Sequence, residues 1–78
     1  MCGIVAYVGS RNCKRVLING LKRLEYRGYD SAGIGVLADS SGAYKVTIVK
    51  EAGKIKELEE ELKNINTDGH CGIGHTRW

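Results

Sequence analysis

Seventy-eight residues form at most one small domain, and a fold of this size removes only about 60% of the unfolded chain's accessible surface from water. A net charge of +3 is too small to indicate a polyanionic partner, so we expect no nucleic-acid partner. The three cysteines, an odd number without Cys-x-x-Cys spacing, argue against a disulfide framework and a structural zinc site, and they favour a reducing cytoplasm.

The first predicted element is a strand over residues 4–8, a continuous apolar run that ends at Gly9. Runs of this kind are typical of strands covered on both faces, so we predict that this strand is central in its sheet. The run is far shorter than the roughly 18 residues that a membrane-spanning helix needs, and no basic region precedes it as in a signal peptide. We therefore expect a soluble, cytoplasmic protein without a membrane partner.

A helix is predicted next, with Ser10 as its N-cap and Gly28 as its stop. Its apolar positions recur at helical spacing and are Cys13, Val16, Leu17, Leu21 and Leu24. Cys13 is therefore expected to be a buried, inert thiol. Gly20 lies in this stripe and costs about 1 kcal/mol relative to Ala, so we expect another element to approach it closely. The opposite face can be basic, as on an ordinary solvated helix, through Arg11, Lys14, Arg15 and Lys22.

The middle of the chain predicts a hairpin of two strands, over residues 31–38 and 44–50, joined by a turn over residues 39–42. The apolar residues on one face of the first strand are Ile34, Val36 and Ala38. Those on one face of the second are Tyr44, Val46 and Ile48. The alternation in the second strand is the pattern of a half-buried strand, which should lie near an edge of the sheet.

Residues 54–64 return to helical spacing, and residues 71–78 alternate as a last strand. The apolar stripe of the helix is Ile55, Leu58, Leu62 and Ile65. One face of the strand carries Cys71, Ile73, His75 and Arg77. The resulting order, β-α-β-β-α-β with hairpins, indicates an α+β fold rather than an alternating parallel one.

Cys2 is the candidate nucleophile. Removal of Met1 would make it the N-terminal residue, so that one residue would supply both a thiol and an α-amine. A thiol has a reference pKa of about 8.5 and an α-amine one of about 7.7 to 8.0, so near neutral pH an unprotonated amine can take a thiol's proton. N-terminal Thr and Ser enzymes use this arrangement. The alternative interpretation is that Cys2 is not a nucleophile but a small apolar residue at the start of a buried strand.

Three stretches of the sequence stand out together: Met1-Cys2-Gly3-Ile4-Val5, residues 24–33 with the sequence LEYRGYDSAG, and Gly74-His75-Thr76-Arg77-Trp78. Together they resemble the glutaminase domain of the glucosamine-6-phosphate synthase family, within the N-terminal-nucleophile glutamine amidotransferases. The resemblance covers all 78 residues. It implies part of a four-layer αββα sandwich, in which two antiparallel sheets lie between helical layers.

The resemblance also implies roles for particular residues. Cys2 would attack the side-chain amide of glutamine, form a γ-glutamyl thioester and release ammonia. Arg77 would bind glutamine with Trp78 beside it, and Arg27 would lie in a loop beside the site. A separate domain would use the ammonia to convert fructose 6-phosphate to glucosamine 6-phosphate. The family needs no metal or cofactor, and the full-length enzyme is expected to be a homo-oligomer.

The sequence departs from the family pattern at Ala6, where the family usually has Gly, a change that should cost little unless the backbone needs a positive φ. The resemblance places three parts beyond Trp78: the oxyanion-hole Asn-Gly, the acid that grips the substrate's α-amine, and the sugar isomerase domain. We therefore expect residues 1–78 to be the N-terminal part of a glutaminase domain, and to be inactive alone. The alternative is a non-catalytic fragment or interaction module that keeps half of the fold.

Other polar residues near these motifs have structural explanations. Arg27 could line the site, or it could simply favour a helix C-terminus by its charge. Tyr26 and Tyr29 are expected to be packing residues. No known zinc spacing matches the set formed by His70, Cys71 and His75, so we expect no metal site.

Overall fold

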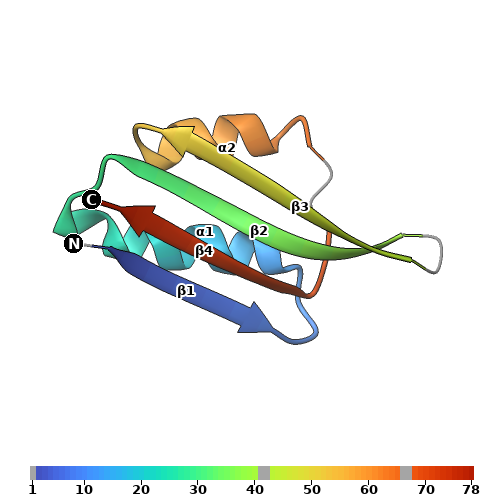
Figure 1. Ribbon diagram of the computed structural model, residues 1–78. Helices are drawn as coiled ribbons and strands as arrows, with labels where there is room; N and C mark the ends of the chain where they lie inside the picture. Colours follow the sequence, from blue (N-terminus) through green and yellow to red (C-terminus); the bar gives the residue numbers. More distant parts are fainter. Residues whose placement is uncertain (1, 41–42, 66–67) are drawn as a thin grey trace.

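The computed structural model describes residues 2–40, 43–65 and 68–78. Its strands are β1 (Gly3–Val8), β2 (Ser31–Ser40), β3 (Ala43–Ala52) and β4 (Cys71–Arg77), and its helices are α1 (Cys13–Leu24), α2 (Ile55–Leu62) and a 3-10 helix (Glu25–Arg27). This order confirms the predicted β-α-β-β-α-β sequence and the α+β class (Figure 1). No helix in the described ranges is both long and apolar enough to cross a membrane.

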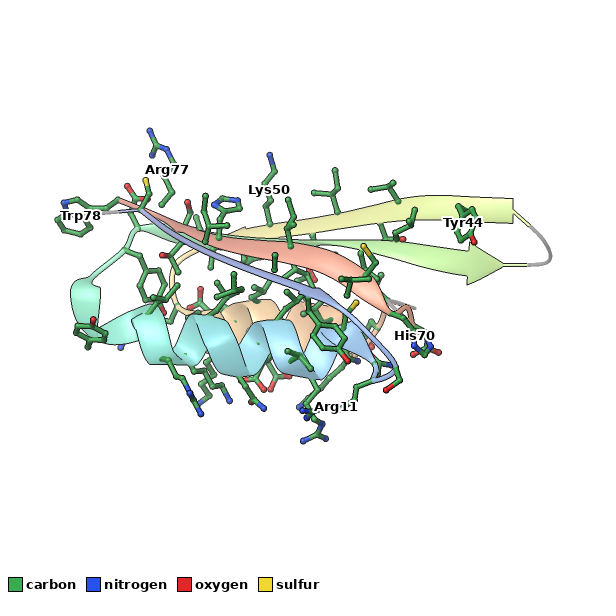
Figure 2. The ribbon with its side chains drawn as sticks, turned by 90° about the horizontal axis from the view of Figure 1, so that it is seen from below. Arg11, Tyr44, Lys50, His70, Arg77 and Trp78 are labelled. Carbon is green, nitrogen blue, oxygen red and sulfur yellow. The ribbon has the colours of Figure 1, made fainter. Side chains whose placement is uncertain are left out.

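The strands form one antiparallel sheet in the order β1-β4-β2-β3. Both helices lie on the same face of this sheet, and no element of the described chain covers the other side, which we call the outer face (Figures 1 and 2). The prediction that the first strand is central is wrong, because β4 lies between β1 and β2 and leaves β1 at an edge. Ile4 and Val8 of β1 are 77% and 79% exposed because they lie on the uncovered outer face, whereas Val5 and Tyr7 pack against the core.

β3 lies at the other edge, as predicted, but the apolar residues predicted to share one face of it point away from the helices. Tyr44, Val46 and Ile48 are 75%, 61% and 66% exposed, so the predicted half-buried arrangement is wrong for them. Among the β3 residues whose burial is described, Val49 is buried, and it pairs with Ile34 on the helix side. β2 continues through positions 39 and 40 of the predicted turn, whose positions 41–42 lie outside the described residues.

The core fills the space between the sheet and the two helices. Its buried side chains from the helices include Leu17, Leu21, Ile55, Leu58 and Leu62, and those from β2 are Ala32, Ile34 and Val36. Full burial of one such large aliphatic side chain stabilises a fold by about 1.5–3 kcal/mol. The predicted stripe is wrong at Ile65, which lies beyond α2 and is 36% exposed. The close approach expected at Gly20 is confirmed, because a Cβ there would lie 3.0 Å from Val5 Cγ1.

The two ends of α1 fix the segments that flank it. Asn12, rather than the predicted Ser10, is the N-cap, and its Oδ1 accepts a hydrogen bond from Lys14 N at 3.0 Å. Both residue types are good caps, but Asn12 is held in place because its Nδ2 donates to Asp68 Oδ1 at 3.0 Å. At the other end the 3-10 helix leads to Gly28, whose φ of 79° confirms the predicted stop.

Candidate active site

The three sequence motifs meet at one end of the sheet. Gly3 at the start of β1 pairs with Thr76 near the end of β4, so Cys2 and Arg77 lie at the same end of neighbouring strands. Ser31 at the start of β2 pairs with Arg77 from the other side. Both ends of the described chain therefore lie together at this end of the sheet (Figure 1). The middle motif reaches the same place because it is the connection from α1 into β2.

Asp30 links the middle motif to the last one. Its carboxylate Oδ2 lies 3.6 Å from Arg77 Nη1, and the two side chains are 56% and 68% exposed. Its backbone N–H donates to the Arg77 carbonyl at 2.7 Å, and its own carbonyl accepts a hydrogen bond from Gly53 N at 3.0 Å. The backbone bonds hold Asp30 in place, so its carboxylate can orient the Arg77 guanidinium. Asp30 was not singled out from the sequence, although it lies in the second motif.

Trp78 lies against the loop of the middle motif. A Cβ at Gly28 would lie 3.8 Å from Trp78 Cζ3, and the positive φ of Gly28 directs the chain toward β2. The Trp78 side chain is 69% exposed, so one side of it remains available to a ligand. The side chain of Arg27 lies outside the described part of the structure, and both readings of this residue stay predictions.

Cys2 is an exposed, free thiol immediately before β1. Its neighbour Gly3 fits tightly against the end of α1 and against β4, because a Cβ there would lie 2.7 Å from Leu24 Cδ1 and 3.1 Å from Thr76 Oγ1. This contact fixes the backbone from which the thiol projects. Among residues 2–40, 43–65 and 68–78, no side chain is hydrogen-bonded to the thiol, and Met1 lies outside those ranges.

The other thiols and the histidines lie away from this cluster. Cys13 is fully buried, as predicted, and burial raises the pKa of its thiol despite hydrogen bonds from the backbone N–H groups of Cys13 and Cys71. Cys71 is exposed at the far end of β4, His70 is exposed just before it, and His75 is half-buried. Within the described ranges, no group of three or more His, Cys, Asp and Glu side chains is placed to hold a metal ion.

The two tyrosines of the middle motif differ. The Tyr29 hydroxyl donates to Glu25 Oε2 at 2.7 Å and accepts from Ile55 N at 2.8 Å, which confirms its structural role. Burial, and then the hydrogen bond to Glu25, raise the pKa of Tyr29. Tyr26 is 84% exposed, so the expectation that it is a packing residue is wrong.

The outer face adjoins the cluster and is largely apolar. A groove of about 260 Å³ runs over Gly35, between Ile48 of β3 and Ile73 of β4. Lys50 and His75 line the same groove on the side nearer Arg77. Figure 2 shows Lys50 and Arg77 on this outer side of the sheet, and Arg11 on the side of the helices. The candidate site is thus an open corner beside an uncovered apolar surface.

Comparison with known proteins agrees with the sequence motifs. No family model matches the chain. Over all 78 residues it is 53% identical to the N-terminal region of proteins named glutamine-fructose-6-phosphate aminotransferase (isomerizing), from Staphylococcus aureus and from Staphylococcus epidermidis. The match covers 100% of this chain and 12% of the length of those relatives.

Proposed function

We propose that this homologue of the N-terminal region of glutamine-fructose-6-phosphate aminotransferases forms the nucleophile side of a glutamine amidotransferase site. The reaction of the completed site is release of ammonia from the side-chain amide of glutamine. A separate domain of the complete protein then uses the ammonia to convert fructose 6-phosphate to glucosamine 6-phosphate. The observation that carries this proposal is the meeting of Cys2, the segment 28–30 and Arg77 at one end of the sheet.

Cys2 is the proposed nucleophile and its own α-amine the proposed base. After Met1 is removed, the amine takes the thiol proton, and the sulfur attacks the amide carbon of glutamine. The C–N bond breaks, the proton passes to the leaving nitrogen, and ammonia departs. Water then hydrolyses the γ-glutamyl thioester, which restores the thiol and releases glutamate. The lack of any other base bonded to the thiol, within the residues described, supports this role of the amine.

Arg77 is proposed to bind the α-carboxylate of glutamine. A guanidinium can hold a carboxylate through two parallel, charge-assisted hydrogen bonds. Asp30, 3.6 Å from one guanidinium nitrogen, orients that group while leaving it exposed to a ligand. Trp78 borders the same corner through its contact with Gly28, and Arg27 is a further candidate in the adjacent loop.

We infer that a second antiparallel sheet covers the outer face in the complete protein, giving the αββα sandwich of N-terminal-nucleophile hydrolases. Sheets in sandwiches pack about 10 Å apart through apolar side chains, and the exposed Val46, Ile48 and Ile73 support such a partner. The cytoplasmic location, the homo-oligomeric state and a separate sugar isomerase domain stay predictions.

The test uses a grafted enzyme, in which residues 1–78 replace the matched N-terminal region of the Staphylococcus aureus relative. We expect this enzyme to release ammonia from glutamine, and Cys2→Ala to reduce the rate by at least about 10³-fold. Cys71→Ala, which removes an exposed thiol at the far end of β4, is the matched control and should leave the rate unchanged.

The same enzyme tests the amine. A preparation that retains Met1, confirmed by intact mass, should be inactive because an amide nitrogen has no lone pair available for proton transfer. Equal rates with and without Met1 would exclude the amine as the base. Ammonia release that survives Cys2→Ala would exclude Cys2 as the nucleophile. A grafted enzyme that releases no ammonia would instead favour the second candidate function, an interaction module, for which the uncovered apolar face is the supporting observation.

A further inference from the structure

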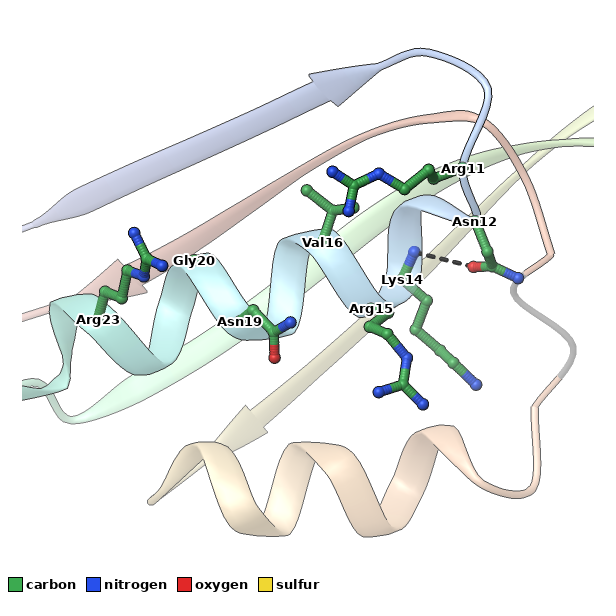
Figure 3. A pocket seen from close by; sticks show the side chains of 8 residues that line it. All are labelled: Arg11, Asn12, Lys14, Arg15, Val16, Asn19, Gly20 and Arg23. Carbon is green, nitrogen blue, oxygen red and sulfur yellow. Dashed lines mark hydrogen bonds between the residues drawn. The ribbon is translucent and has the colours of Figure 1, made fainter.

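A second hollow, of about 690 Å³, lies along α1 and the two residues that precede it (Figure 3). Its volume is within the range of small-molecule sites, about 300–1,000 Å³. The charged residues that line it are all basic: Arg11, Lys14, Arg15 and Arg23. Val16 and Gly20 also line the hollow, and neither has a long side chain that would fill it. The hollow is separate from the candidate active site, since it lies on the helix side of the sheet.

The four cations of this hollow are not neutralised by the fold. Within residues 2–40, 43–65 and 68–78 none of them has an ion-pair partner. Two nearby cations do form ion pairs: Lys22 with Glu59 at 2.9 Å and Lys63 with Glu60 at 3.1 Å. All four cations therefore remain available to a bound anion.

The spacing of the cations along α1 indicates how many anionic groups the ligand carries. At a rise of about 1.5 Å per residue, Arg15 and Arg23 lie about 12 Å apart along the helix, and Asn19 lies midway between them. The two side chains therefore start far enough apart for their guanidinium groups to contact separate anionic groups of one ligand. No aromatic side chain lines the hollow, so it offers no stacking surface for the bases of single-stranded nucleic acid.

We propose that this hollow binds a small anion carrying two or more phosphoryl groups. The guanidinium groups of Arg15 and Arg23 contact separate phosphoryl groups through bidentate hydrogen bonds, and Lys14 and Arg11 add charge at the end near the start of α1. Asn19 hydrogen-bonds the linking part of the ligand. The diphosphate of a nucleotide and inorganic pyrophosphate share this chemistry.

The test is calorimetric titration of the chain with four probes at a fixed ionic strength of about 0.15 M, which screens unspecific attraction. The probes are inorganic pyrophosphate, adenosine diphosphate, orthophosphate and sulfate. We expect pyrophosphate to bind with a Kd below about 1 mM and at least about tenfold more tightly than orthophosphate or sulfate. Tighter binding of adenosine diphosphate than of pyrophosphate would identify a nucleotide as the source of the anion.

Two variants locate the site. Arg15→Ala with Arg23→Ala should weaken pyrophosphate binding by at least about tenfold, whereas Lys56→Ala, an exposed cation on α2, should leave it unchanged. Backbone amide shifts of the unaltered chain provide a measurement that needs no variant, and pyrophosphate should move the amides of residues 11–23. Equal affinity for sulfate and pyrophosphate, an equal loss from Lys56→Ala, or tighter binding of an oligoglutamate peptide would each overturn the proposal.

Discussion

At the scale of single residues, the contact between Arg77 and Asp30 makes the sharpest prediction. Arg77→Lys keeps the charge but loses the planar fork that matches a carboxylate. In the grafted enzyme we therefore expect the KM for glutamine to rise about tenfold, with kcat falling less, because this contact is remote from the scissile amide. Steady-state kinetics with glutamine as the varied substrate measure both constants. An unchanged KM would remove Arg77 from the substrate-binding site.

Asp30→Asn provides the companion measurement. It removes the carboxylate that lies 3.6 Å from the Arg77 guanidinium but leaves both backbone hydrogen bonds of Asp30 intact. The KM should rise in the same direction and by less than for Arg77→Lys. Combining the two substitutions should give less than the sum of their separate effects, because residues that act through one contact are not additive.

At the scale of elements, Tyr29 joins the end of α1 to the start of α2. Its hydroxyl donates to Glu25 Oε2 and accepts from the backbone N–H of Ile55, the first residue of α2. Ile55 is fully buried, so loss of the hydroxyl leaves that N–H without its partner. Tyr29→Phe should lower the free energy of unfolding by about 1–3 kcal/mol. Tyr26→Phe, at an exposed position, is the control and should have no measurable effect in urea unfolding.

The pH dependence of the same contact follows from the raised pKa of Tyr29. A phenol whose pKa is higher in the folded state stabilises the fold below its unfolded pKa of about 10, and this contribution is lost as the pH rises through the folded value. The difference in unfolding free energy between the native chain and Tyr29→Phe should therefore be constant near neutral pH and shrink above pH 10. A gap that widens at high pH would contradict this assignment.

The elements themselves were more predictable than their surroundings. The spacing of Leu17, Leu21, Leu58 and Leu62 identified the buried faces of both helices, because a helix face is defined by its own sequence. The alternation of β3 also identified which residues share a face, but it could not reveal that the outer face carries no second layer. The position of β1 in the sheet was predicted wrongly because it depends on pairing with β4, which the sequence of β1 alone does not reveal.

The candidate site was predictable only in part. Cys2, Arg77 and Trp78 were identified from motifs, and the structure places them at one end of the sheet. Asp30 was missed because its role depends on a contact with a residue far along the chain. The N-cap was misassigned for the same reason, since Asn12 is favoured over Ser10 by its bond to Asp68.

At the scale of the whole molecule, the outer face makes the isolated chain prone to self-association. Large apolar patches and unpaired strand edges favour contacts between copies, and β1 and β3 are both edge strands. We expect residues 1–78 to sediment above the monomer mass and to release little ammonia from glutamine. Ile48→Lys, in the apolar groove, should shift the chain toward monomer, whereas Ile65→Lys, at a position outside the strands, should not. A monomer with turnover near that of the grafted enzyme would contradict both expectations.

The insertion of β4 between β1 and β2 also has a consequence for the order of events during synthesis. β2 and β3 are neighbours in sequence and can pair early, whereas β1 must wait for the last segment of the chain before it gains a partner. Closing such a long loop is entropically costly, so this pairing comes late. We therefore expect the first residues to stay accessible on the ribosome, so that the proposed removal of Met1 can precede the placement of Cys2 at its corner. Pulsed proteolysis of stalled nascent chains should find residues 1–8 protected only after residues 71–77 have emerged.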